Sequence, residues 1–315
     1  MEYTHQSILT KEILRAFDYL SLINGPIFID GTLGLAGHSI SLVAENKESK
    51  IKVIGIDKDA KALKIAQRNI KEAGLAENFV LVHDDFHNIN DILDNLCVKK
   101  IDGMLLDLGV SSMQLDDKSR GFSFSNPEIA LDMRMDQSQS KSAFTVVNTY
   151  NQKQLEDVLK NGEEWHFRKI AAAIVSSRKT GAIVTVGDLL KVIDATLPKK
   201  FSKTHPATDT FRALRLEVND EISRLDKSIQ DMIDVLHTGG KLAIITFHSL
   251  EDRIVKHKFR ELEKPCTCPP KQPYCTCGQK PKIKVITQKP ILPNDEEIVA
   301  NPRARSAKLR IAQRI

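Results

Sequence analysis

Apolar and polar positions along the chain predict short strands that alternate with helices. Four apolar runs end in acidic or small polar residues, and helix-compatible stretches separate them. The runs are PIFID (26–30), KVIGID (52–57), NFVLVHDDF (78–86) and IDGMLLDLG (101–109). This alternation is typical of an α/β fold with a parallel sheet, in which ligands gather at one edge, beyond the carboxyl ends of the strands.

The pattern changes after the fourth run. Helical periodicity dominates from about residue 151 to residue 197, and a strand pattern returns in KLAIITF (241–247). Two alternating segments near the C-terminus have the pattern of edge strands. We therefore expect one discontinuous sheet domain and one mostly helical insertion. The sheet domain would comprise residues 1–112 and 208–315, and the insertion residues 113–207.

The first strand leads into a glycine-rich loop, DGTLGLAGH (30–38). Glycines let a ligand approach the backbone closely, and the start of the following helix offers free N–H groups. Neither common phosphate pattern fits. No Lys lies between Pro26 and Glu45, which excludes a P-loop, and Leu33 replaces the second Gly of G-x-G-x-x-G. From its spacing alone, the loop is either a ligand-binding loop or an ordinary turn.

Asp57 ends the second predicted strand, about twenty residues after the loop. In doubly wound folds, an acidic residue at this place binds the hydroxyl groups of a ribose. The alternative is that Asp57 caps the helix that begins directly after it. The sequence leaves both interpretations open.

Composition is that of an ordinary globular protein. The chain is 41% hydrophobic and 28% charged, as is usual for soluble globular proteins. Its 315 residues are enough for one large domain or two modest ones. No apolar run is long enough to span a membrane, and the N-terminal segment carries charges throughout. We therefore expect a cytoplasmic protein with reduced thiols that does not bind membranes.

Positive charge is concentrated near the C-terminus. The formal net charge is +5, but residues 280–315 contain nine Lys and Arg against three acidic residues. A basic C-terminal segment could bind a polyanionic partner. The alternative is that these charges only form a solvated surface without a binding role.

Six groups of residues together resemble one family of enzymes. They are DGTLGLAGHS, DGMLLDLGVSSMQLD with RGFSF, LDMRMD, HPATDTFRALRLEVNDE, TFHSLEDRIVK and NPRARSAKLR. Over its whole length the chain thereby resembles the RsmH/MraW family, S-adenosylmethionine-dependent methyltransferases that modify N4 of a cytidine in small-subunit (16S) ribosomal RNA. The resemblance implies a class I methyltransferase fold, with a Rossmann-like, mostly parallel seven-stranded sheet and a helical insertion after the fourth strand.

The resemblance also implies S-adenosyl-L-methionine as cofactor and locates the residues that would bind it. They are Ala36, Gly37, His38, Asp57, Phe86, Asp107 and Gln114. Asp57 would hold the ribose hydroxyls, Phe86 would pack on the adenine, and Asp107 would lie beside the methionine moiety. The loop would hold the methionine end of a cofactor without phosphate, which explains why neither phosphate pattern fits. His38 would contribute through its backbone and not through a catalytic imidazole.

Methyl transfer to a cytosine amino group benefits from a hydrogen-bond acceptor beside N4, because the N4 lone pair is delocalised into the ring. Asp107, at the end of the fourth predicted strand, is the first candidate for this catalytic role. The Leu108 carbonyl and the hydroxyl of Ser111 or Ser112 are the next candidates.

Basic residues of the family segments are candidates for binding RNA phosphate or stacking on the base. They are His205, Arg212, Arg215, His248, Arg253, Arg303 and Arg305. The alternative is structural pairing with acids such as Glu217, Asp220, Glu251 and Asp252. The expected partner is small-subunit ribosomal RNA within a partly assembled subunit.

Four of the five cysteines lie within twelve residues, in the pattern C-x-C-x6-C-x-C. They are Cys266, Cys268, Cys275 and Cys277. Four thiols can hold a structural zinc, although C-x2-C spacings are commoner in zinc knuckles. The resemblance requires no metal, and none is expected in the catalytic site. Cys97 is expected to be a small core residue.

Other functions fit the sequence less well. A nicotinamide-dependent oxidoreductase should carry G-x-G-x-x-G, and a non-catalytic RNA-binding protein would not need acids at strand ends. A methyltransferase that acts on DNA, protein or a small molecule is the serious alternative, which only the family segments outside the cofactor loop oppose.

Overall fold

The computed structural model describes residues 7–117, 119–197, 205–269, 272 and 274–315. Contacts divide the chain into two compact units, one formed by Met1–Gly109 with Arg224–Ile315 and the other by Val110–Ser223. We call the first the sheet unit and the second the helical unit.

The helical unit, Val110–Ser223, extends beyond the insertion that the sequence predicts at 113–207. The main difference is that the unit includes α10 (Thr208–Val218). Phe211, Leu214 and Val218 of this helix are buried in the core of the helical unit. They recur at three- and four-residue spacing, so one face of α10 packs into that core and the whole helix belongs to it.

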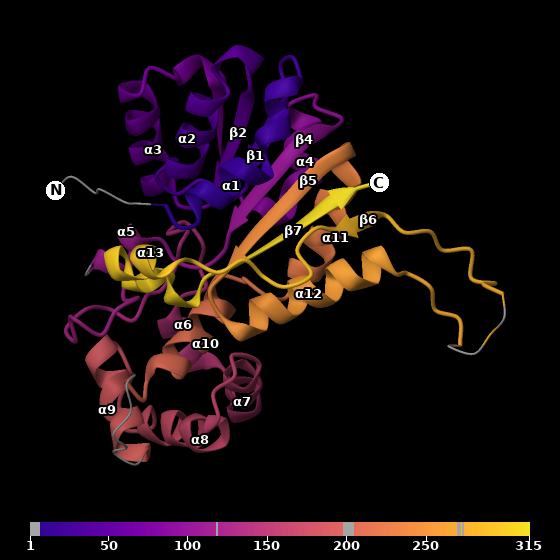
Figure 1. The fold of residues 1–315 in the computed structure, drawn as a ribbon. Coiled ribbons are helices and arrows are strands. Elements are labelled where there is room, and N and C mark those ends of the chain that lie inside the picture. The colour runs from indigo at the N-terminus through magenta and orange to yellow at the C-terminus, as the bar shows by residue number, and fades with distance from the viewer. Residues whose placement is uncertain (1–6, 118, 198–204, 270–271, 273) are drawn as a thin grey trace. The chain divides into compact units, whose positions relative to one another are not determined.

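Seven strands form one sheet in the sheet unit, in the order β3-β2-β1-β4-β5-β7-β6 (Figure 1). Their bounds are β1 Ile27–Asp30, β2 Lys52–Asp57, β3 Phe79–His83, β4 Ile101–Asp107, β5 Leu236–Thr246, β6 Ile283–Val285 and β7 Lys308–Arg314. Strands β1 to β5 pair in parallel, whereas β7 is antiparallel to both β5 and β6. The expected mostly parallel, seven-stranded sheet of an α/β protein is confirmed.

Helices cover both faces of this sheet (Figure 1). One face carries α1 (Thr10–Ala16), α2 (Gly37–Glu45) and α3 (Ala60–Glu72), and the other carries α4 (Ile89–Asn95), α11 (Leu225–Val235) and α12 (Ser249–Glu263). Leu105 of β4 packs in the same cluster as Phe17, at the end of α1. Its neighbours Met104 and Leu106 pack in the same cluster as Phe259 of α12. Successive strand residues point to opposite faces, so this uninterrupted apolar run is buried on both sides.

Short helices lie in the connections of the sheet unit. They are η1 (Asp18–Leu22), η2 (Lys47–Ser49), η3 (Ala76–Asn78), η4 (Phe86–Asn88), α13 (Asp295–Ala300) and η5 (Pro302–Ser306). Cys97 follows α4 in a left-handed turn with φ 55°, and it is exposed. The expectation that Cys97 is a core residue is therefore wrong, because the turn that ends the helix directs it to solvent.

The helical unit has a core of its own. Its helices are α5 (Ser112–Asp116), α6 (Ala143–Thr149), α7 (Gln152–Asn161), α8 (Phe167–Ser177), α9 (Val186–Thr196) and α10. Leu155, Ile170 and Leu189 are fully buried among them. α7 and α9 begin at capping boxes, in which Asn151 and Thr185 satisfy backbone N–H groups at the helix start. Among the described residues, no helix is long and apolar enough to cross a membrane.

Asn219 joins the end of α10 to a buried loop of the helical unit. Its Oδ1 accepts a hydrogen bond from the Met135 N–H over 2.7 Å. Its Nδ2 donates to the carbonyls of Met133 and Arg215 over 2.8 and 2.9 Å. The side chain therefore satisfies backbone groups in a buried part of the unit.

Asn219→Ala should lower the free energy of unfolding by about 2 to 4 kcal/mol, because a buried N–H and a buried carbonyl lose their partners. Chemical denaturation followed by circular dichroism measures the change. Asn90→Ala, at an exposed position of α4, is the matched control and should stay within about 0.5 kcal/mol of the parent. Equal stability of the two variants would contradict the role assigned to Asn219.

Candidate active site

The strand order reverses at β1, which lies between β2 and β4. The sheet grows from β1 through β2 and β3 in one direction, and through β4 and β5 in the other. Such a switch point leaves a crevice beyond the carboxyl ends of the strands, where doubly wound folds bind their ligands. Asp30 ends β1, Asp57 ends β2 and Asp107 ends β4. Three carboxyl groups therefore lie at this edge of the sheet.

The loop after β1 is packed closely against β4. The Gly31 N–H donates to the Leu105 carbonyl over 2.9 Å, and a Cβ at this glycine would lie 2.5 Å from Cδ2 of Leu106. A larger residue there would require the Leu106 side chain to move. Ala36, the N-cap of α2, has φ 68° and gives the helix no side-chain acceptor. The start of α2 therefore lacks a side-chain cap, as in helices whose N-terminus binds a ligand.

Asp57 anchors this loop. Its Oδ2 accepts from the Gly34 N–H and its Oδ1 from the Asp59 N–H, each over 2.8 Å. Asp59, and not Asp57, is the N-cap of α3, since the Asp59 side chain accepts from the Lys61 N–H. The interpretation of Asp57 as the helix cap is therefore wrong. Burial raises the pKa of Asp57 to about 6, and each of its oxygens keeps a lone pair for a further donor.

One carboxyl oxygen of Asp107 accepts no hydrogen bond from any of the described residues. Its backbone N–H donates to Thr32 Oγ1 over 2.6 Å, but its buried Oδ1 has no hydrogen-bond partner there. Burial, with the nearby charges of Asp30 and Glu251, raises the pKa of Asp107 to about 8. A buried, unsatisfied carboxyl oxygen with a strongly raised pKa at a sheet edge is a mark of a ligand site.

Asp30 and Thr32 are site residues to which the sequence patterns assign no role. Ser39 Oγ, in the first turn of α2, donates to Asp30 Oδ2 over 2.6 Å, and burial raises the pKa of Asp30 to about 6. This bond ties α2 to β1, while the Thr32 hydroxyl ties the loop to Asp107. The position of Asp30 at a strand end is the signal that points to it.

The remaining expected cofactor residues of the sheet unit are largely buried. His38 Nε2 lies 2.8 Å from the Ile8 carbonyl, and burial lowers the pKa of its imidazole. That His38 acts through its backbone and not through its imidazole stays a prediction. A Cβ at Gly37 would lie 2.2 Å from Ser7 Oγ, so this glycine allows close packing. Phe86 begins η4 and is 7% exposed.

Gln114 belongs to the helical unit, where its side chain caps a helix. Gln114 Oε1 accepts from the Ser111 N–H over 3.0 Å, and Ser111 Oγ accepts from the Gln114 N–H over 3.2 Å. This reciprocal capping box starts α5. The structure thus gives Gln114 a structural role, and its role in cofactor binding stays a prediction.

Acids near His248 are largely engaged in structural pairs. His248 Nε2 lies 3.0 Å from Oε1 of Glu251, which is buried at 1% exposure. Asp252 pairs with Arg310, whose Nε lies 2.6 Å from Asp252 Oδ1. Neither ring nitrogen of His248 has a hydrogen-bond partner among the described residues, so its role in RNA binding stays a prediction.

Arg212 and Arg215 on α10 also have acidic partners. Arg212 Nη1 lies 2.8 Å from Asp209 Oδ1, and Arg215 Nε lies 3.0 Å from Glu221 Oε1. The expected partner Glu217 instead accepts from the Tyr150 hydroxyl over 2.8 Å. The two arginines are paired, but with other acids than the sequence suggests.

The other expected substrate-binding residues are exposed. Arg253 lies on α12, Arg303 and Arg305 lie in η5, and His205 precedes α10. The His205 ring lies 5.0 Å from the ring of Phe124, centroid to centroid, within the helical unit. These side chains are accessible to a large partner.

Comparison with known proteins identifies the family. The model of the MraW methylase family matches residues 2–315. The chain belongs to the MraW methylase family. Proteins named "Ribosomal RNA small subunit methyltransferase H" from Clostridium botulinum and Lachnospira eligens are 48% and 46% identical to it. Each alignment covers 100% of this chain, with 100% and 99% of the respective relative.

A crystal structure described as a putative rRNA methylase from Clostridium thermocellum is also similar to this methyltransferase. It matches with a TM-score of 0.45 and 12% identity, over 99% of this chain and 100% of its own. The resemblance noted in the six sequence segments is thus confirmed by the family match.

The cofactor of this methyltransferase is S-adenosyl-L-methionine. When bound, it supplies an electrophilic methyl group on a positively charged sulfonium. The residues present fit such a group: the edge offers three carboxyl groups, one of them with an unsatisfied buried oxygen. A cation at this edge favours the ionised carboxylates and lowers their raised pKa values.

Without cofactor, Asp107→Asn should gain stability relative to the parent as pH rises. The folded parent keeps Asp107 protonated up to its pKa of about 8, while the unfolded chain ionises it near pH 4, so rising pH favours unfolding across this window. The amide of the variant does not titrate. Calorimetric melting at several pH values from about 5 to about 8 should show a widening difference in melting temperature between variant and parent.

Asp91→Asn, at an exposed position of α4, is the matched control for this experiment and should show a constant difference. A difference between Asp107→Asn and the parent that is the same at every pH would contradict the raised pKa.

Proposed function

We propose that this protein transfers a methyl group from S-adenosyl-L-methionine to N4 of a cytidine in small-subunit ribosomal RNA. The observation that carries the proposal is the unsatisfied Oδ1 of Asp107 at the switch point, in a chain of the MraW methylase family. Full-length relatives at 48% and 46% identity are named as ribosomal RNA small subunit methyltransferases.

Asp57 would hold the cofactor ribose. Its two oxygens already hold the backbone at Gly34 and Asp59, which places the carboxyl group rigidly at the end of β2. Each oxygen can accept one further bond from a vicinal hydroxyl. Ala36, Gly37 and the other loop residues would surround the methionine end, where the start of α2 has no side-chain cap.

Asp107 would accept a hydrogen bond from the N4 amino group of the target base. The amino lone pair must become localised as the new carbon–nitrogen bond forms, and an acceptor for an amino proton helps this. The displaced proton leaves through this carboxyl group or through water. Asp107 has two oxygens, so contact with the cofactor through one leaves the other for the base.

The helical unit would recognise the RNA. Trp165 is 86% exposed at the start of α8, and Arg168 and Lys169 beside it are exposed as well. An exposed aromatic ring among cations suits stacking on an unpaired base and binding of phosphate. The exposure of Trp165 in the structure is the observation that points to this role.

The basic C-terminal segment would contact RNA phosphate in the sheet unit. Arg303 and Arg305 are exposed in η5, within the segment that holds nine basic residues against three acids. We propose that both units bind a folded RNA surface, which favours a partly assembled subunit over a short free RNA as substrate.

Asp57→Ala should weaken S-adenosylmethionine binding by about 10- to 100-fold, the loss expected for hydrogen bonds to a charged acceptor. Isothermal titration calorimetry on the purified protein measures the affinity. Asp91→Ala serves as the control with an exposed acid of the same unit and should bind like the parent. Unchanged affinity in Asp57→Ala would exclude the ribose role, whereas tight binding of NAD by the parent would exclude the cofactor assignment.

The substrate is identified with labelled cofactor and small subunits from cells that lack the enzyme. After incubation, the RNA is digested and the labelled nucleoside is identified by mass spectrometry. We expect N4-methylcytidine from the parent and a loss of about 100-fold or more in rate with Asp107→Ala. Label on a ring carbon, a ribose oxygen or protein would contradict the N4 assignment, and full activity of Asp107→Ala would contradict only the choice of acceptor.

A further inference from the structure

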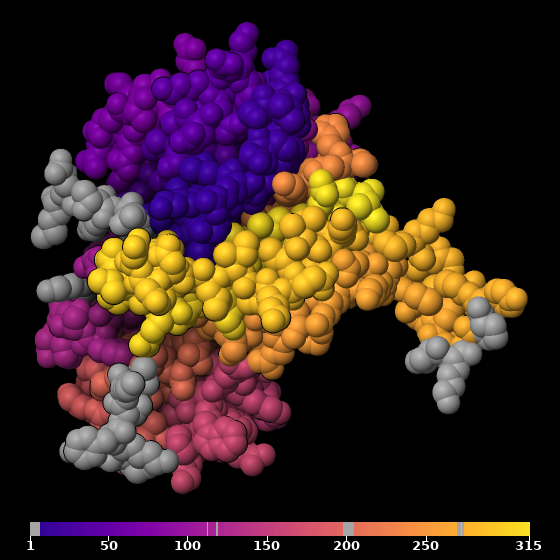
Figure 2. Space-filling model, in the orientation of Figure 1, coloured from indigo at the N-terminus to yellow at the C-terminus, as the bar shows by residue number. Residues whose placement is uncertain are grey.

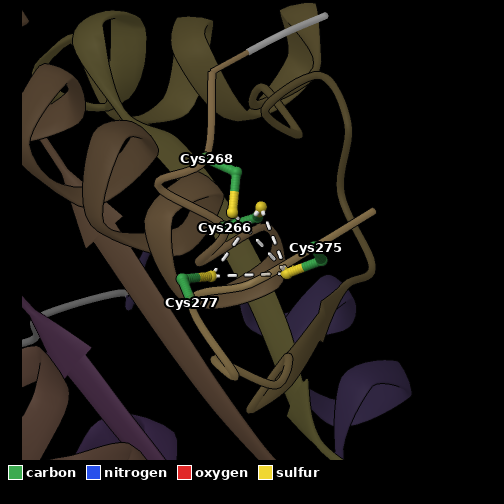
Figure 3. Close-up of side chains that lie close together, drawn as sticks. All are labelled: Cys266, Cys268, Cys275 and Cys277. Carbon is green, nitrogen blue, oxygen red and sulfur yellow. Dashed lines mark hydrogen bonds between the residues drawn. The ribbon is translucent and has the colours of Figure 1, made fainter. Parts of the chain in front are cut away.

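Four thiols converge in the loop between α12 and β6 (Figure 3). We call them the thiol cluster: Cys266, Cys268, Cys275 and Cys277. All four sulfurs lie within 4.8 Å of one another, although a segment of six residues separates the two C-x-C pairs. The loop folds back so that both pairs face a common centre (Figure 3).

The spacing of the sulfurs is that of a tetrahedral metal site. The Sγ atom of Cys275 lies 3.7 Å from that of Cys266 and 3.4 Å from that of Cys277. The pairs Cys268–Cys275 and Cys266–Cys277 are each 3.9 Å apart. A tetrahedron with zinc–sulfur bonds of about 2.3 Å places its sulfurs about 3.8 Å apart, whereas a disulfide needs about 2.05 Å. We propose that the thiol cluster binds one Zn²⁺ ion.

Backbone groups of the loop prepare the sulfurs to act as ligands. The Thr276 N–H donates to Cys268 Sγ over 3.3 Å. The N–H groups of Gln279 and Thr267 donate to the Cys277 thiol. Zinc binds thiolates, and N–H donors to a coordinating sulfur stabilise its negative charge.

The loop has no apolar core to hold its shape. Among the described residues from Lys264 to Lys282, none is buried, and Tyr274 is 83% exposed. Figures 1 and 2 show this segment extending away from the rest of the sheet unit. A short loop without an apolar core needs a cross-link to stay ordered, and a metal supplies one.

The zinc is structural. Four protein ligands fill a tetrahedral site and leave no open position for water or substrate. The thiol cluster contains none of the residues assigned to the cofactor or to methyl transfer. Its consequence is mechanical: the ion fastens the end of α12 to the start of β6, where the Lys282 N–H already donates to the Leu262 carbonyl over 2.9 Å.

The test is the metal content of the full-length protein, purified under reducing conditions without chelators and analysed by inductively coupled plasma mass spectrometry. The parent should hold about one zinc per chain, and the double variant Cys268→Ser with Cys277→Ser should hold less than about a tenth. Cys97→Ser is the matched control, because Cys97 is exposed and outside the thiol cluster, and it should retain the full equivalent.

Three further readouts separate a structural zinc from an adventitious one. Removal of the metal should speed tryptic cleavage after Lys282, which Ile283 follows, by about 10-fold or more, and added zinc should restore protection. Calorimetric affinity for S-adenosylmethionine should stay unchanged. Cobalt reconstitution should give the absorption of a tetrahedral thiolate site.

Three results would overturn the proposal. The first is less than about a tenth of an equivalent of zinc in the parent even after reconstitution and desalting. The second is full zinc content in the double variant. The third is a disulfide within the thiol cluster in protein isolated from a reducing cytoplasm and trapped by alkylation.

Discussion

The parallel pairing of β1 with β2 and β4 is the constraint on which the candidate active site depends. It brings Asp30, Asp57 and Asp107 to one edge of the sheet, where each carboxyl group loses most of its water. A buried charge is unfavourable unless hydrogen bonds or an opposite charge compensate it. Donors from the loop and from α2 compensate Asp30 and Asp57, while one oxygen of Asp107 has no donor among the described residues.

The same carboxyl groups shape the loop that they face. Asp57 holds the backbone at Gly34, and Thr32 bonds to the backbone of Asp107, so the loop connects three strands. Gly31 permits this approach because a side chain there would collide with β4. The geometry of the candidate cofactor site is therefore determined before a ligand binds, which reduces the ordering that binding would require.

Different parts of the chain are stabilised by different means. The sheet unit and the helical unit each bury an apolar core, and the helical unit adds capping boxes and the bonds of Asn219. The loop between α12 and β6 has neither a core nor regular structure among its described residues. Its four thiols lie close enough to bind a single ion, which would hold the loop together as an apolar core does in the two units.

The sequence by itself determined the strands, their acidic ends, the glycine loop and the family, because apolar runs and their flanking residues are local signals. Only the tertiary structure decided that Asp59 caps α3, that α10 belongs to the helical unit, and that Arg212 and Arg215 pair with acids. It also decided which carboxyl oxygen lacks a donor among the described residues and that the four thiols meet. Spacing along a chain specifies periodicity, whereas partners, burial and pKa depend on which distant segments the packing brings together.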